Sequence, residues 1–490
     1  MAALLAATPL AVIMIGMGVL RRSALVAGGA GLAVAVLLSL TAFRPAQGEL
    51  ASLMRGVTAE AGHATLTILW IILPALAIFE LQKQSDAIAH IRNALASLTD
   101  DRSMQAILIA WFFGLFMEGA AGFGTPVALA APLLVGLGYA PVRAVVLALL
   151  GHAAGVSFGA VGTPALAQIA ITGLTETEIA GRTAALHAVC APFLLLAMVR
   201  LAANGPLSRG DVLWTATAAV CFLLPSLALA ALIGPELPTL GGALMGGAAF
   251  IVLLRRGRAP VGLNPRQLIA DLSPYLLILL LVLLTRLIPP IQRGLSVVNF
   301  SWTFDGYSGS FQPFYHPGTM LFLGLALAAI ARGQAAMLLT ALAAALRRLL
   351  PVALALLVML ALSRLMVHAG MIASLAAAAA SVGPAWPVLA PFVGVLGTFI
   401  TGSATASNIL FTDLQLSTAQ SLALPVPLLV AAQGFGAAIG NIVAPHNIIA
   451  GSATVGLVGR EGDVLARTVT PCLLYAGLGA VMVFLGINLL

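Results

Sequence analysis

Long apolar stretches separated by short polar turns run along most of the chain. A helix needs about 20 apolar residues to cross the hydrocarbon core of a membrane. The first two stretches of this kind, Ala2–Leu20 and Ser23–Ala42, are separated only by Arg21 and Arg22. After allowance for loops and broken helices, the pattern predicts an all-α polytopic membrane protein with about 12–14 membrane segments.

Glycine, proline and small polar residues interrupt the apolar pattern at four places. At 118–126 the sequence is EGAAGFGTP, whose three glycines and one proline destabilise a helix interior. Similar interruptions occur at 155–164, 401–408 and 440–447. Such a backbone persists at membrane depth only where protein buries it or a watery cavity lies beside it. The helix that starts after the first interruption offers free N–H groups and a positive dipole end, which suit an anion.

The four interruptions are evenly spaced, which suggests an internal repeat. Gly122 and Gly159 are 37 positions apart, and Gly402 and Gly440 are 38 positions apart. Paired interruptions at matching places in two halves indicate a transporter binding site, although coincidence is an alternative in a chain with 50 glycines. We therefore expect two inverted-topology repeats with re-entrant or broken helices at the substrate site. The expected parts are a first repeat at 1–254, with a binding tip at 118–126 and a break at 155–164; a basic cytoplasmic linker at 255–268; and a second repeat at 269–490, with a binding tip at 401–408 and a break at 440–447.

Composition agrees with a membrane protein and excludes a soluble one. The 490-residue chain is 61% hydrophobic and 8% charged, so a soluble fold of this size could not bury its apolar surface. The net charge of +7 comes mainly from arginines, which are densest in the linker at Arg255, Arg256, Arg258 and Arg266. This pattern indicates cytoplasmic loops and not a nucleic-acid partner. The three cysteines are far apart, so we expect neither a metal site nor a disulfide framework.

Three motifs carry a resemblance to a known family. They are EGAAGFGTPVALAAPLLVGLGY at Glu118–Tyr139, TGSATASN at Thr401–Asn408 and GNIVAPHNIIAGSATVGLVGREGDVL at Gly440–Leu465. In order and spacing these motifs resemble the L-lactate permease family. The resemblance implies inverted repeats with re-entrant hairpins. It also implies a secondary active transporter that takes up L-lactate, D-lactate and glycolate by proton symport across the bacterial inner membrane. The sequence departs from the family pattern at Ala404, where Asp is frequent.

A 2-hydroxymonocarboxylate presents a carboxylate, a hydroxyl and a small apolar group to its binding site. Backbone N–H groups, hydroxyls and amides can meet the carboxylate without the cost of burying a fixed charge. The alternative is that the Ser and Thr side chains only cap the broken helices, and that Phe123 only packs. The expected substrate-binding residues are Gly122, Phe123, Gly124, Thr125, Thr163, Ser403, Thr405, Ser407, Asn408, Asn441, His446 and Asn447.

Glu118 is the candidate for proton coupling, because it stands directly before the first tip among Gly and Ala residues. Burial away from a cation favours the neutral form of a carboxyl group, and a bound anion nearby would oppose its ionisation. Taking up a proton with the substrate removes this repulsion. The structural alternative is that Glu118 accepts hydrogen bonds from the hairpin backbone or pairs with an arginine such as Arg143. No cofactor and no metal is expected.

Two other functions compete with proton-coupled transport. A membrane-embedded enzyme would need a convergent catalytic set, and only Glu118 is plainly embedded beside a motif, so we expect no enzyme activity. Within transport, the alternative is a sodium-coupled organic anion transporter of a related inverted-repeat family, because unwound carbonyls beside Ser and Asn can hold sodium. The expected partners are the monocarboxylate, a proton and the lipid bilayer, with a homodimer left open.

Overall fold

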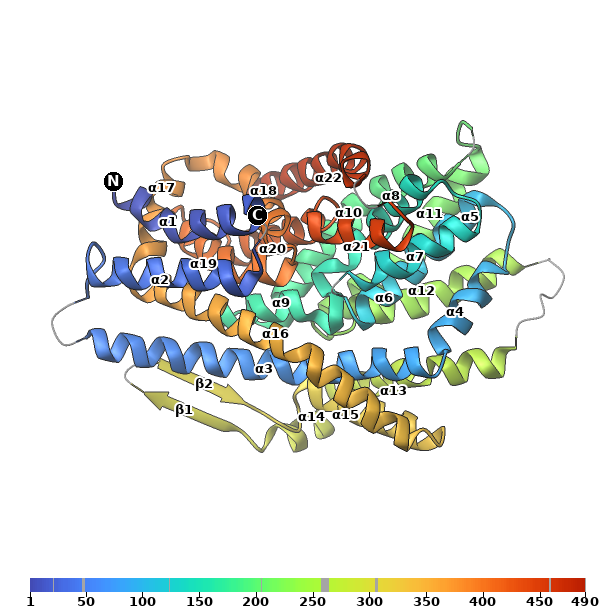
Figure 1. Ribbon diagram of the computed structural model, residues 1–490, viewed down its shortest axis with the longest axis horizontal. Helices are drawn as coiled ribbons and strands as arrows, with labels where there is room; N and C mark the ends of the chain where they lie inside the picture. Colours follow the sequence, from blue (N-terminus) through green and yellow to red (C-terminus); the bar gives the residue numbers. More distant parts are fainter. Residues whose placement is uncertain are drawn as a thin grey trace.

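The computed structural model describes residues 1–20, 22–45, 49–122, 124–203, 205–256, 264–304, 307–457 and 460–489, and these are almost entirely helical (Figure 1). The earlier helices are α1 (Ala2–Met14), η1 (Ile15–Val19), α2 (Ala24–Leu40), α3 (Leu50–Gln84), α4 (Ala87–Ala96), α5 (Arg102–Ala106), η2 (Ile107–Phe113), α6 (Gly114–Ala120), α7 (Thr125–Gly136), α8 (Pro141–His152), η3 (Ala153–Phe158), α9 (Gly159–Thr172), α10 (Glu176–Ala202), α11 (Arg209–Leu232) and α12 (Pro238–Arg255). The later helices are α13 (Pro265–Leu287), α14 (Pro289–Ser296), α15 (Pro317–Ala331), α16 (Ala335–His368), α17 (Met371–Ala380), η4 (Gly383–Ala385), α18 (Trp386–Thr401), α19 (Ala404–Ser421), α20 (Val426–Gly440), α21 (Pro445–Thr454) and α22 (Glu461–Leu489).

The predicted polytopic helical membrane protein is confirmed. In the described part of the chain, eleven helices are long and apolar enough to cross a membrane, and five shorter apolar helices accompany them. A local departure from an all-α fold is an antiparallel hairpin of β1 (Phe300–Phe304) and β2 (Tyr307–Phe311). The hairpin lies against α3, where His63 Nε2 is 3.2 Å from the carbonyl oxygen of Ser310.

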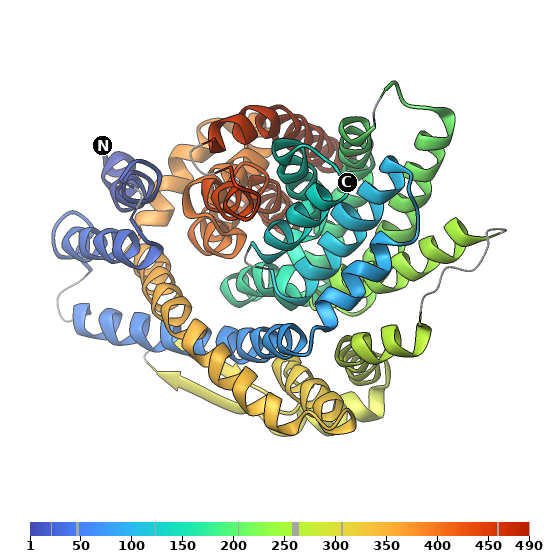
Figure 2. The ribbon, with the colours of Figure 1, turned by 45° about the vertical axis from the view of Figure 1, so that its right-hand side comes forward.

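Two long helices, α3 and α16, pack against each other and cross along one side of the molecule (Figures 1 and 2). They contain 35 and 34 residues, so each is about 50 Å long at a rise of about 1.5 Å per residue. The hydrocarbon core of a bilayer is only about 30 Å thick, so these helices must tilt strongly or extend beyond it. An ion pair joins the two helices, with Glu80 Oε1 2.7 Å from Arg348 Nη1.

The order of elements after each long helix is the same in the two parts of the chain. A ten-residue helix follows first, as α4 and as α17. The next helix ends at a tip (α6 and α18), and another leaves the tip (α7 and α19). A further helix ends at a break (α8 and α20), and a short helix (α9 and α21) and a long final helix (α10 and α22) follow it. This recurrence agrees with two repeats, whereas their inverted topology and the boundaries at 254 and 269 stay predictions. Of the predicted linker, 257–263 lies outside the described residues, and α13 begins at Pro265.

Glycines let α18 and α20 approach each other backbone to backbone. A Cβ at Gly436 of α20 would overlap the carbonyl oxygen of Pro391, and a Cβ at Gly394 of α18 would overlap that of Gln433. Small residues allow such close packing between helices in membranes. Because α18 ends at the second tip and α20 ends at the second break, this contact fixes those two interruptions relative to each other.

We predict that Gly436→Ala lowers the thermal stability of the purified protein, because the added methyl group forces two helix backbones apart. Overpacking of this kind typically costs about 1–3 kcal/mol. Thermal melting in detergent measures the effect. Gly477→Ala in α22 is the matched control, since its Cβ would meet nothing within 4 Å, and alanine is the better helix former. Equal melting temperatures for Gly436→Ala and the wild type would contradict the close approach.

Candidate functional site

The first tip is an unwound turn between α6 and α7, as predicted. α7 begins at Thr125, with Pro126 in its first turn. Gly122 and Gly124 have φ angles of 58° and 78°, in the left-handed region that glycine adopts without steric cost. Phe123, one of the predicted binding residues, lies outside the described residues.

The first break is a stretch of left-handed backbone at the start of α9. Ala160, Val161 and Gly162 have φ angles of 43°, 55° and 84°. The first two carry a Cβ, so each costs about 1–2 kcal/mol in this conformation. Packing holds the strained turn, because Gly162 lies against the carbonyl group of Pro235. The hydroxyl of Thr163 also donates to the carbonyl of Ala160 at 2.6 Å.

The second tip and the second break also interrupt helices at the predicted places. Gly402, with a φ of 70°, separates α18 from α19. Ser403 caps α19, and its Oγ accepts a hydrogen bond from the N–H of Ala406 at 3.3 Å. α20 ends at Gly440, and α21 begins at Pro445 after a short turn.

The second break contacts both tips. A Cβ at Gly124 of the first tip would lie 3.1 Å from Asn447 Oδ1. A Cβ at Gly402 of the second tip would lie 3.0 Å from the Cβ of the neighbouring His446. Two tips that are distant in sequence therefore meet at adjacent residues of the same turn.

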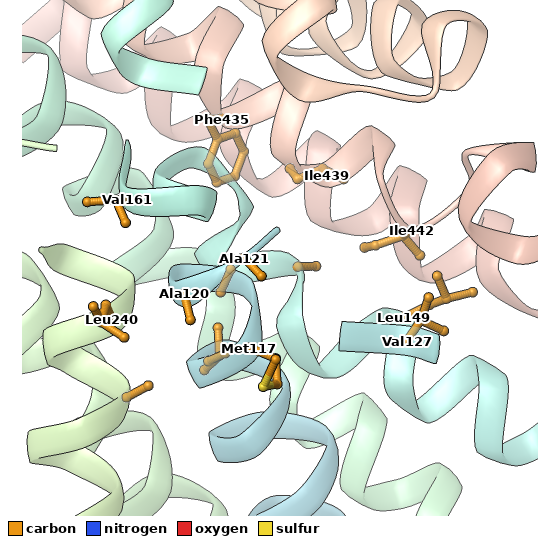
Figure 3. Packing of buried hydrophobic residues seen from close by; sticks show 14 of the residues in the cluster. Met117, Ala120, Ala121, Val127, Leu149, Val161, Leu240, Phe435, Ile439 and Ile442 are labelled. Carbon is orange, nitrogen blue, oxygen red and sulfur yellow. The ribbon is translucent and has the colours of Figure 1, made fainter. Parts of the chain in front are cut away.

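The first break completes the assembly. Asn408 Nδ2, in the last residue of the second tip, donates to the carbonyl of Pro164 at 3.0 Å. On the other side, Gly122 of the first tip lies against Ala160. Figure 3 shows buried hydrophobic side chains from α6, α9, α12 and α20 around Ala121. We call the assembled segments the four-break cluster, which comprises 118–126, 155–164, 401–408 and 440–447.

Most hydroxyl groups of the predicted site already donate to the protein backbone. Thr125, Thr163 and Ser407 each donate to a carbonyl, at 2.8, 2.6 and 2.9 Å. With the cap formed by Ser403, these contacts match the capping alternative. Thr405 differs, because its hydroxyl has no hydrogen bond among the described residues although the side chain is only 6% exposed. Its hydroxyl is therefore available to a ligand.

The amide groups of the cluster are only partly satisfied. Asn408 Oδ1 is buried without a hydrogen-bond partner among the described residues, and the bond from Nδ2 to the Pro164 carbonyl fixes which end of the amide is the oxygen. Asn447 Nδ2 donates to the carbonyl of Asn441 at 3.3 Å. His446 is exposed. The four-break cluster thus contains a buried hydrogen-bond acceptor, Asn408 Oδ1, and an exposed side chain, His446.

Glu118 is buried between the first tip and the first break, with only 3% of its surface exposed. Its carboxyl group lies against Gly122 and Gly159, and a Cβ at Gly159 would overlap Oε1. Oε2 has no hydrogen-bond partner among the described residues, and His152 Nε2 lies 3.9 Å away. Within the described part of the chain, Glu118 forms neither the ion pair with Arg143 nor the hairpin hydrogen bond that the structural alternative requires.

Three other buried carboxylates are paired with arginine. Besides the pair between α3 and α16, Glu236 Oε1 is 2.7 Å from Arg286 Nη2, and Asp271 Oδ1 is 3.0 Å from Arg332 Nη2. An unpaired charge is costly in a protein interior, whereas a nearby cation holds a carboxylate ionised. Glu118 has no such cation among the described residues, so its carboxyl is chemically suited to binding and releasing a proton.

A serine–histidine contact lies in the first break, where Gly155–Gly159 reads GVSFG and has the GxSxG spacing of serine hydrolases. Ser157 Oγ is 2.9 Å from His187 Nε2, and His187 Nδ1 is 2.7 Å from Tyr475 Oη. Ser157 Oγ also lies 3.2 Å from the carbonyl oxygen of Gly434, which is a second acceptor for its hydroxyl proton. The phenol of Tyr475 stands where a carboxylate orients the ring in a catalytic triad. The network instead ties α10 to α20 and α22.

Comparison with known proteins identifies the family. Residues 2–490 match the family described as L-lactate permease. The chain belongs to the L-lactate permease family. A glycolate permease of Escherichia coli (strain K12) is 30% identical, over 99% of this chain and 95% of its own length. An L-lactate permease of Streptococcus iniae is 32% identical, over 86% of this chain and 91% of its own length.

The fold of this L-lactate permease family member is similar to that of a solved transporter. The YdaH transporter of Alcanivorax borkumensis matches with a TM-score of 0.51 and 16% sequence identity, over 91% of this chain and 90% of that chain. At this identity the likeness concerns the fold alone. Family membership and the spanning helices together make the chain a multi-pass membrane permease for a small-molecule substrate.

Two residues beside Glu118, His152 and Gly159, were not predicted as site residues. A signal existed for each of them. His152 is an ionisable side chain within an apolar run, which is typical of functional positions in membranes, and Gly159 lies within a break. Neither signal indicates that the partner is Glu118, because that contact arises only when α6, α8 and α9 pack together.

We predict that Gly159→Ala strongly reduces transport, because the new methyl group would displace the Glu118 carboxyl group. Gly159 has a φ of −64° and a ψ of 156°, which alanine adopts freely, so the effect would be steric. Overpacking of about 1–3 kcal/mol at the site corresponds to roughly 5- to 160-fold in rate. Uptake of a labelled monocarboxylate into proteoliposomes measures the loss.

The control for this experiment is Gly181→Ala in α10, where a Cβ would make an ordinary contact at 3.6 Å. It should transport like the wild type. Wild-type uptake by Gly159→Ala would show that the Glu118 carboxyl group does not lie against Gly159.

Proposed function

We propose that the protein is a secondary active transporter that takes up L-lactate, D-lactate and glycolate together with a proton across the bacterial inner membrane. The names of its relatives support the substrate class, since one is a glycolate permease and others are L-lactate permeases. These substrates share a carboxylate next to a carbon that bears a hydroxyl group. The relatives are bacterial proteins, which supports the location.

The observation that carries the proton coupling is the unpaired, buried carboxyl group of Glu118 beside the first tip. Four helices, α7, α9, α19 and α21, begin at the four-break cluster, and each N-terminus carries roughly half a positive charge that attracts an anion. A substrate carboxylate held there lies in the same poorly solvated region as Glu118. Two negative charges repel in such a region, so substrate binding and proton uptake favour each other.

Two polar groups of the four-break cluster that have no hydrogen bond among the described residues, a hydroxyl and an amide oxygen, recognise different parts of the substrate. The Thr405 hydroxyl and backbone N–H groups of the tips bind the carboxylate, and Asn408 Oδ1 accepts the proton of the substrate hydroxyl. A site built to bond a hydroxyl rejects analogues that lack it, so acetate and propionate bind less tightly than glycolate and lactate. The other predicted residues that the structure describes shape the tips or flank the bound anion, namely Gly122, Gly124, Thr125, Thr163, Ser403, Ser407, Asn441, His446 and Asn447.

We predict that Thr405→Ala raises the apparent Michaelis constant for L-lactate uptake by roughly 10- to 150-fold, because a hydrogen bond to a charged group is worth about 1.5–3 kcal/mol. Initial rates in proteoliposomes over a range of lactate concentrations give this constant. Thr217→Ala is the matched control, since the Thr217 hydroxyl donates to a carbonyl of its own helix on an exposed face. If both variants keep the wild-type constant, Thr405 does not bind the substrate.

We predict that Glu118→Gln abolishes accumulation of labelled lactate driven by an imposed proton gradient but retains exchange of lactate for lactate. The amide keeps the size of the side chain and cannot release a proton, so coupling is lost while the binding site stays. Glu49→Gln, at the exposed start of α3, is the control and should accumulate lactate like the wild type.

The same vesicles separate proton coupling from sodium coupling. The wild type should accumulate lactate when the outside is acidified and should not respond to an imposed sodium gradient. Accumulation that follows only the sodium gradient would replace the proposal with the sodium-coupled alternative. Proton-driven accumulation by Glu118→Gln would move the coupling role to another residue.

A further inference from the structure

We propose that His152 is the proton partner of Glu118, so that the two side chains form one proton-binding unit, which we call the proton pair. The inference rests on the proposed proton coupling and identifies the group that accepts a hydrogen bond from the protonated carboxyl. His152 is thereby a positioning residue for the coupling step. The juxtaposition that carries it is a buried imidazole facing a buried carboxyl that has no cation partner among the described residues.

Hydrogen bonding decides which ring nitrogen of His152 faces the carboxyl group. His152 is the last residue of α8, and its Nδ1 is 2.6 Å from the carbonyl oxygen of Ala148. A carbonyl oxygen has no proton to give, so Nδ1 must donate and therefore carries the ring proton. The neutral imidazole then presents the bare lone pair of Nε2 toward Glu118 Oε2 at 3.9 Å.

The number of protons on the pair determines whether the two groups attract or repel. With no shared proton, an ionised carboxylate faces a lone pair, and the contact is repulsive. With one proton, the carboxyl group donates an O–H···N hydrogen bond to Nε2, and the contact is attractive. A second proton would leave an uncompensated positive charge in the interior, which is costly. The pair therefore holds one proton, which matches the single charge of a monocarboxylate.

Within the described part of the chain, the elements packed against the pair bring no further charge into contact with it. α6, α7, α9, η2 and η3 contain no further ionisable side chain. Arg143 lies at the exposed start of α8, and Arg255, at the end of α12, donates to a distant backbone carbonyl. Glu236 before α12 is paired with an arginine, and His187 of α10 is satisfied within its own network. The remaining charges on α10 and α22 lie toward the ends of those helices. His446 of α21, which also packs against α8, is exposed and contacts Gly402 of the second tip.

The pair is placed so that its protonation acts on the broken segments. The Glu118 carboxyl group lies against Gly122 of the first tip and Gly159 of the first break. The distance of 3.9 Å to Nε2 exceeds that of a hydrogen bond, which is about 2.7–3.2 Å. Protonation therefore draws the end of α6 toward α8, and deprotonation pushes it away. The proton lost from Oε2 passes to water when the site is open.

Infrared titration of the purified protein tests the pair without any transport. The wild type should show the carbonyl band of a protonated carboxylic acid, and this band should vanish in Glu118→Gln, which assigns it. In His152→Gln an amide N–H can face the carboxylate where the lone pair stood. The ionised form then gains a hydrogen bond, so the band should disappear at a pH about 1–2 units lower than in the wild type.

His187→Gln is the matched control, because His187 is an equally buried histidine whose two ring nitrogens already have partners. It should leave the pH midpoint of the band unchanged. A folded His152→Gln with the wild-type midpoint overturns the proposal. If His152→Gln does not fold, His152→Asn carries the same amide on a shorter side chain, and an unchanged midpoint there overturns it equally.

A transport experiment links the pair to coupling. In His152→Gln the pH dependence of proton-driven lactate accumulation should shift toward acid by the same amount as the infrared midpoint, while the Michaelis constant at low pH stays near the wild-type value. A purely structural role would lower the rate at every pH and leave the profile in place. If the wild type itself shows no proton-driven accumulation, the proposed function fails, whereas the infrared result still decides whether the pair exists.

Discussion

Backbone polar groups at membrane depth have no water to bond with, and the centre of this fold follows from that constraint. Four interrupted helices each leave carbonyl and N–H groups without partners in their own helix. Side chains from neighbouring helices supply the missing bonds. Thr239 of α12 donates to the carbonyl of Gly155 at 2.7 Å, and Thr398 of α18 donates to that of Ala437 in α20 at the same distance. The interruptions are therefore stable only as an assembly, which explains why segments far apart in sequence meet at one place.

Sequence alone locates the interruptions well, because glycine and proline act on the backbone at their own positions. The roles of the hydroxyl groups cannot be located in this way, because each depends on which backbone carbonyl lies within hydrogen-bonding distance after folding. Thr125 and Ser407 donate inward to the backbone, whereas Thr405, two positions before Ser407, has no hydrogen bond among the described residues. All three have the same chemistry in the sequence, so no local pattern could have separated them.

Long-range pairing limits what hydropathy can show about α3 and α16. Both helices contain charged residues that make them look like several short segments separated by polar turns. In the fold these charges meet across the two helices: Glu60 Oε2 is 2.9 Å from His368 Nε2, and the two residues are 308 positions apart. A charge within an apolar run signals that a partner exists, but the partner becomes known only once the helices cross. The same holds for Glu118 and His152.

The left-handed turn at Ala160 and Val161 has an energetic consequence for turnover. Two non-glycine residues in this region raise the free energy of the structure by about 2–4 kcal/mol relative to ordinary helical backbone. The upper end of this range is close to the free energy with which a ligand of about millimolar affinity binds. The first break therefore stores free energy of this size in the conformation described here. Packing against Pro235 holds the strained turn, and a conformation that relaxes this backbone would recover about 2–4 kcal/mol.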